Sequence, residues 1–305
     1  MTRIVLAYSE SLVPASANAE GAADHDAIAW LAARYSADVV ALTLDFGRGR
    51  ELEALRDRAL ASGALRAHVL DVAGEFASDY LLPALRAGAL ATTVARTTGL
   101  GRLIIAQKLV EIAAIETTTF VSHGCPPPEE RLATAVASLQ PTMTVVPLPS
   151  SIVTAARLKS RAKTHPVRPF ERAFVELSFV GGAPTAINGV PMPLVDLIGS
   201  LDMLLGTPRV GQLGLLDTPS AVVLHRAHDG LRAATTSDDR AGLVEQYSAF
   251  IESGAWFSPE RRALDRTIEE IEKTVNGTVR LQLVNDVCDI VDVKRLETAR
   301  VVKVQ

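Results

Sequence analysis

The residues best placed to do chemistry follow two apolar runs near the start of the chain. Residues 4–7 form a continuous apolar run, and residues 39–44 form a second one. Such runs are typical of strands buried on both faces of a parallel sheet. Ser9 comes just after the first run and Asp45 ends the second. Because parallel strands end at the edge where α/β sheets place ligands, we expect Ser9 and Asp45 to border one pocket.

The segment after Ser9 has the position of a phosphate-binding loop but not its residues. Such loops need glycine, because backbone N–H groups must approach the anion without a side chain in the way. Here Glu10 would repel a phosphate, Pro14 has no N–H to donate, and the first glycine is Gly21. The sequence therefore predicts the architecture of an anion site without its chemistry, with a surface connection of no function as the alternative.

Other reactive side chains form weaker patterns. His225 and His228 are three residues apart and would share a helix face, but no third ligand is evident, so we predict no metal site. Cys125 and Cys288 are far apart, show no disulfide or metal spacing, and Cys125 has no evident basic partner. His123 ends an apolar run, and packing or turn support is expected of it rather than catalysis. For Asp45, a polar role in the pocket and a turn or capping role both remain open.

Composition sets the outer limits. The chain has 305 residues, 48% of them hydrophobic, which is enough to build a sizeable core. Its net charge of −4, with both signs dispersed, gives no reason to expect nucleic acid or an anionic membrane as a partner. No apolar stretch is long enough to span a bilayer, and no signal peptide is evident. We expect a cytoplasmic protein.

The elements that must position these groups divide at about residue 165. Strands alternate with helices over residues 1–165, which predicts a doubly wound, mostly parallel sheet. Residues 91–101 have no clear period and read as a loop before an amphipathic helix at 102–116. Residues 166–305 predict a smaller α+β domain. In it, Gly181-Gly182 indicates a hairpin, and Ser258-Pro259 has the residues of a helix start.

Several collinear segments together resemble the argininosuccinate synthase family. They include His123-Gly124-Cys125, Trp256-Phe257-Ser258-Pro259 and the segments 4–9, 27–31, 35–47, 50–71, 79–90, 108–113 and 276–281. The resemblance implies an N-type ATP-pyrophosphatase (HUP-like) α/β domain followed by a synthetase-like domain. It also implies ATP-dependent ligation of citrulline to aspartate through citrullyl-AMP, with ATP and Mg²⁺ as cofactors and a tetramer as the usual assembly.

The family's binding residues transfer to few positions of this chain. On the nucleotide side, the resemblance leaves a remnant at Ala7, Tyr8, Ser9, Asp45, Gly47 and Gly124. On the substrate side, it leaves Thr98 and Arg131. It assigns no catalytic residue and no metal ligand.

The departures from the family pattern are concentrated at its ligand loops. The family loop S-G-G-L-D-T-S is replaced here by a segment that begins Ser9-Glu10-Ser11, and residues 15–26 include an insertion. The family sequence T-G-K-G-N-D-Q-V-R is replaced by residues 126–131, where only Arg131 fits. The tyrosines and glutamate of the citrulline loop are missing at 91–98, and the C-terminal tail is shorter.

These departures lead to three hypotheses. The first is a catalytically degenerate family member that acts as a binding or regulatory protein, as a homo-oligomer (dimer or tetramer) or beside a related active enzyme. The second is an ATP-dependent ligase or nucleotide-binding enzyme of arginine or related amino-acid metabolism with a rebuilt site, in which residues 15–26 form a new lid. The third is a small-molecule sensor that holds a carboxylate with Arg131.

Overall fold

A computed structural model describes nine segments of the chain: residues 2–9, 26–47, 51–90, 94–125, 130–152, 173–205, 219–236, 240–284 and 287–296. The domain boundary predicted near residue 165 lies outside these segments, so the division into 1–165 and 166–305 stays a prediction. Within the described residues, no helix is both long enough and apolar enough to cross a membrane.

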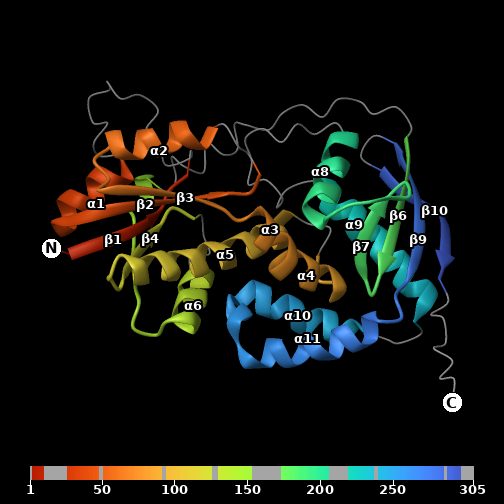
Figure 1. Cartoon of the computed structure of the whole chain (residues 1–305). Coiled ribbons are helices and arrows are strands. Elements are labelled where there is room, and N and C mark those ends of the chain that lie inside the picture. The colour runs from red at the N-terminus through yellow and green to blue at the C-terminus, as the bar shows by residue number, and fades with distance from the viewer. Residues whose placement is uncertain are drawn as a thin grey trace, which may run out of the picture.

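The first half of the chain folds around a parallel five-stranded sheet (Figure 1). Its strand order is β3-β2-β1-β4-β5, so the order reverses between β1 and β4 as in doubly wound folds. The strands are β1 (Thr2–Ala7), β2 (Ala37–Asp45), β3 (Arg66–Asp71), β4 (Phe120–His123) and β5 (Thr144–Val146). The predicted α/β architecture is confirmed.

Helices cover both faces of this sheet because successive side chains of each strand alternate in direction. Ile4 and Leu6 pack with α1 (Ala27–Tyr35) and α2 (Glu51–Ala61), whereas Val5 faces the core that contains α5 (Val94–Ile115) and α6 (Glu130–Leu139). Figure 1 shows α1 and α2 on one side of the sheet and α5 and α6 on the other. Asp26 caps α1 by accepting hydrogen bonds from the N–H groups of Ile28 at 2.8 Å and Ala29 at 3.3 Å.

One expectation for this half needs correction. The loop predicted for 91–101 is wrong, because α5 already begins at Val94. Threonines lower helix propensity only slightly, and burial of Leu100 and Leu103, each 1% exposed, outweighs them. The segment around Pro83 is helical. It is built from α3 (Ala73–Glu75), a π-helical turn (Phe76–Leu81) and α4 (Leu82–Arg86), with Pro83 in the first turn of α4.

The second half is built on an antiparallel sheet of order β10-β9-β6-β7-β8. Its strands are β6 (Ala173–Val180), β7 (Ala183–Ile187), β8 (Val190–Pro191), β9 (Gly277–Val284) and β10 (Val287–Arg295). The hairpin at Gly181-Gly182 is confirmed, since both glycines adopt positive φ angles of 55° and 71°. The helices are α8 (Leu194–Leu204), α9 (Pro219–Thr235), α10 (Ala241–Ser253) and α11 (Pro259–Glu272).

The two halves share one hydrophobic core. Val5 and Leu42 of the first sheet belong to the same buried cluster as Leu177 and Leu281 of the second. Trp256, in the 3-10 turn Ala255–Phe257 before α11, stacks on Tyr80 with ring centroids 5.6 Å apart. This aromatic contact packs the second half against the π-helical turn of the first half.

A buried ion network ties three helices of the second half together. The Glu272 carboxylate at the end of α11 lies 2.7 Å from His228 Nε2 of α9 and accepts a hydrogen bond of 2.7 Å from Arg240 Nη1. The side chain of Glu272 is only 1% exposed and that of Arg240 is 4% exposed. The sequence did not indicate that the Glu272 carboxylate lies beside His228. Among the described residues, no three or more His, Cys, Asp or Glu side chains gather into a group that could hold a metal ion.

Candidate functional site

The carboxyl edge of the parallel sheet brings together the ends of β1, β2 and β4. Ala7 is in register with Leu42 on one side and with His123 on the other. The backbone N–H of Tyr8 donates to the Leu42 carbonyl at 2.8 Å. Ala7, Tyr8, Asp45 and Gly124, which the sequence placed on the nucleotide side, therefore do meet along one edge of the sheet.

Tyr8 occupies the core instead of a pocket. Its side chain is 2% exposed and packs with the cluster formed by β1, α1 and α2. Burial and the nearby charge of Asp26 raise the pKa of the Tyr8 hydroxyl to about 12. A buried phenol on the α1 and α2 side of the sheet serves packing. Ser9, by contrast, is exposed at the end of the described segment.

Asp45 supports a turn. Its Oδ1 accepts the Gly47 N–H at 2.8 Å, and Gly47 has a φ of 96°, which favours glycine. In the neighbouring strand, Asp71 Oδ1 accepts the Ala73 N–H at 3.0 Å. Both carboxylates thus stabilise the backbone turns that follow their strands at this edge. Neither carboxylate gathers with two further His, Cys, Asp or Glu side chains among the described residues.

A second group of side chains lies where β4 ends. The Cys125 N–H donates to Nδ1 of the buried His123 at 3.2 Å, so His123 supports the turn, as the sequence indicated. Burial, and in addition the charge of Arg131, lower the pKa of Arg102, whereas the charge of Cys125 acts in the opposite direction. The charges of Cys125 and Arg131 therefore both act on Arg102, a relation that the sequence did not indicate.

The structure thus adds Arg102 to the candidate residues. Arg102 lies on α5, four residues after Thr98, and Arg131 lies in the first turn of α6. The spacing of four between Thr98 and Arg102 was the available signal, since it puts both on one helix face. Two guanidinium groups that repel each other at the edge of a parallel sheet favour a bound carboxylate or phosphate. The side chain of Thr98 lies outside the described residues.

His123 should be neutral over most of the acidic range, because burial and the Arg102 guanidinium lower its pKa from 6.5 to about 4. A histidine with a lowered folded pKa contributes stability that is fully present above pH 6.5. That stability is lost as the pH falls towards 4, since the unfolded chain takes up the proton first. In an NMR titration, the imidazole resonance of His123, identified by its loss in His123→Gln, should have a midpoint near pH 4. A midpoint above 6 would refute the lowered pKa of His123.

Comparison with known proteins identifies the origin of this arrangement. A family model described as the arginosuccinate synthase N-terminal HUP domain matches residues 3–161, and one described as the arginosuccinate synthase C-terminal domain matches residues 160–295. The chain belongs to the argininosuccinate synthase family. Argininosuccinate synthase of Chlorobium chlorochromatii is 30% identical over 84% of this chain and 82% of its own length. That of Streptococcus thermophilus is 30% identical over 92% and 84%.

Membership of the argininosuccinate synthase family accounts for the fold. Residues 10–25 and 126–129, where the sequence analysis found departures from the family's ligand loops, lie outside the described residues. The described edge contains the sheet ends, the Asp45 turn, Arg102 and Arg131. These elements can orient a carboxylate or phosphate by charge and hydrogen bonds. Binding of this kind requires no nucleophilic side chain.

Proposed function

We propose that this member of the argininosuccinate synthase family is catalytically degenerate and acts as a binding or regulatory protein. The observation that carries the proposal is the loss of ligand-binding residues at several loops of the family pattern on a preserved scaffold. Glu10 and Pro14 stand in the loop after β1, and Pro126, Pro127 and Pro128 replace the segment after Cys125. Family membership makes ATP a plausible ligand, and its weak or absent binding is part of the proposal.

The size of the expected loss follows from charge stabilisation. Removing one donor aimed at developing charge lowers turnover by roughly 10²- to 10³-fold. Glu10 adds repulsion where the family would hold a polyphosphate. The effects of several such changes on turnover are not additive. Together they nevertheless leave no route to ligation at the family's rate.

Arg102 and Arg131 support a binding role. They lie on α5 and α6, and the charges of Arg131 and of Cys125, which belongs to the turn after β4, both act on Arg102. We propose that they hold a carboxylate of a small molecule, such as an amino acid. We further propose a cytoplasmic homo-oligomer, or an assembly with a related active enzyme, as the working form.

The decisive experiment is pyrophosphate release from ATP in the presence of citrulline and aspartate. We expect a rate at least roughly hundredfold below that of the Streptococcus thermophilus enzyme assayed in parallel, because more than one donor has been replaced. In a thermal-shift screen of amino acids, we expect stabilisation that Arg131→Gln removes. A rate within tenfold of the parallel enzyme would refute the proposal.

Calorimetry separates this proposal from the alternative of a ligase or nucleotide-binding enzyme with a rebuilt site. The lid suggested for residues 15–26 lies almost wholly outside the described residues. Heat on addition of ATP, AMP or pyrophosphate at millimolar concentration would favour the alternative, and its absence supports the binding role.

A further inference from the structure

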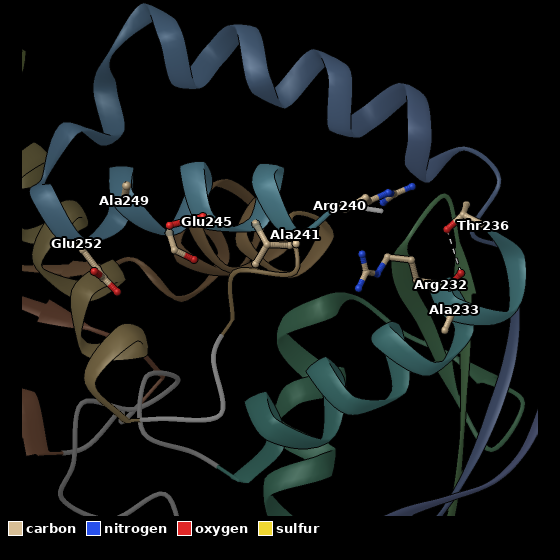
Figure 2. A pocket seen from close by; sticks show the side chains of 10 residues that line it. Arg232, Ala233, Thr236, Arg240, Ala241, Glu245, Ala249 and Glu252 are labelled. Carbon is tan, nitrogen blue, oxygen red and sulfur yellow. Dashed lines mark hydrogen bonds between the residues drawn. The ribbon is translucent and has the colours of Figure 1, made fainter. Parts of the chain in front are cut away.

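A cavity of about 790 Å³ lies between the end of α9 and the length of α10 (Figure 2). Its polar lining residues come from both helices and carry opposite charges. Figure 2 shows the arginines where α9 ends and α10 begins, and the glutamates further along α10. These lining residues are Arg232, Thr236, Arg240, Glu245, Ser248 and Glu252.

The arginine end contains donors that the fold leaves unused. Arg240 is 5% exposed, and its Nη1 is bound to Glu272, whereas its Nε and Nη2 find no partner among the described residues. Arg232 is paired with Asp229 through Nη2, and its buried Nε has no partner within the described part of the chain. Ser248 Oγ is a third such group in the lining. Buried donors without partners cost free energy, and a ligand that accepts hydrogen bonds would offer partners to the side chains that line this cavity.

The start of α10 adds to the attraction for an anion. Arg240 is the N-cap of this helix of 13 residues, and its side chain makes no capping hydrogen bond. The N-terminal end of a helix carries a partial positive charge that favours a carboxylate or phosphate. The helix end and the two guanidinium groups therefore act on the same part of the cavity.

The opposite charge is one to two turns further along the same helix. Glu245 is exposed and follows Arg240 by five residues, which is roughly 7.5 Å along the helix axis at 1.5 Å per residue. A ligand with only a negative charge would make no contact with the Glu245 carboxylate. It would also bring a second negative charge close to that carboxylate. A molecule with an anion at one end and a cation at the other satisfies both ends of the cavity.

We propose that this cavity binds a small dipolar molecule, with its carboxylate at Arg232 and Arg240 and its ammonium group at Glu245. The ligand class is that of amino acids whose two charges are separated by a chain of several carbons. The site is independent of the function proposed for the sheet edge, because none of its lining residues belongs to that edge.

Isothermal titration of the full chain with three matched probes tests the proposal. 6-Aminohexanoate carries both charges, hexanoate carries only the anion, and hexylamine carries only the cation. We expect 6-aminohexanoate to bind at least roughly tenfold more tightly than either of the others, since a charge-assisted hydrogen bond is lost in each case. Equal affinity for hexanoate and 6-aminohexanoate, or no heat with any probe, would overturn the proposal.

Two variants and two controls locate the binding. Arg232→Gln and Glu245→Gln should each weaken 6-aminohexanoate by roughly tenfold, and Glu245→Gln should leave hexanoate unchanged. Arg266→Gln and Glu269→Gln change exposed residues of α11 outside the lining and should change neither affinity. Unchanged affinity in both Arg232→Gln and Glu245→Gln, in proteins with the wild-type melting temperature, would place the ligand elsewhere and refute the assignment.

Discussion

Replacing Glu272 by glutamine will lower the free energy of unfolding by about 3–5 kcal/mol, because it leaves the charge of Arg240 buried without its partner. The two side chains are 1% and 4% exposed, and the oxygen and nitrogen that join them are 2.7 Å apart. Glutamine keeps the shape of the side chain, so the loss reports the missing charge. Urea denaturation of both proteins gives the difference in unfolding free energy.

Controls for this prediction come from the same helix. Glu269→Gln alters an exposed glutamate three residues earlier and should change stability by less than about 0.5 kcal/mol. The double variant Glu272→Leu with Arg240→Met removes both charges and should cost less than the sum of the two single changes. A loss below about 1 kcal/mol for Glu272→Gln would show that the network does not hold an ionised carboxylate.

The buried contacts of Glu272 with His228 and Arg240 also make stability depend on pH. Burial raises the pKa of Glu272, but the hydrogen bonds and charges of His228 and Arg240 outweigh it and leave the pKa below 4.5. A carboxyl group with a lowered folded pKa contributes stability above its unfolded pKa. That contribution is lost as the pH falls below 4.5 and through the folded pKa. Glu272→Gln should therefore flatten this part of the stability profile.

The elements that local patterns specify could be read from the sequence. The apolar run at residues 4–7 gives a parallel strand because both faces of the sheet are covered. Ser258 caps α11 by accepting the Arg261 N–H, and Pro259 sits in the first turn, as predicted. In each case the determining residues are neighbours in the chain, so propensity and capping chemistry act without help from distant segments.

The site depends on contacts that a single sequence does not reveal. Glu272 follows the buried Ile268 by four residues, so a glutamate on the apolar face of α11 was a visible anomaly. Its partners, however, come from α9 and from the start of α10. Tyr8 shows the same limit: the resemblance placed it beside a nucleotide, but which face of the sheet its ring takes depends on how α1 and α2 pack.

Gly254→Ala should be as disruptive as the loss of Glu272, although it adds a single methyl group. Gly254 ends α10 with a φ of 81°, and a Cβ there would lie 2.1 Å from the carbonyl oxygen of Arg131. The left-handed conformation alone costs a residue with a side chain about 1–2 kcal/mol, and forcing apart two packed backbones costs about 1–3 kcal/mol more. We therefore expect a total loss of about 2–5 kcal/mol in denaturant unfolding.

Gly63→Ala separates the two contributions to this loss. Gly63 follows α2 with a φ of 95°, and nothing lies within 4 Å of the position its Cβ would take. It should therefore show only the backbone strain of about 1–2 kcal/mol. Because Arg131 lies in the first turn of α6, the displaced carbonyl in Gly254→Ala should also move its guanidinium and weaken any carboxylate held there, whereas Gly63→Ala should not. Equal losses of stability in the two variants would mean that α10 and α6 do not approach as closely as the structure shows.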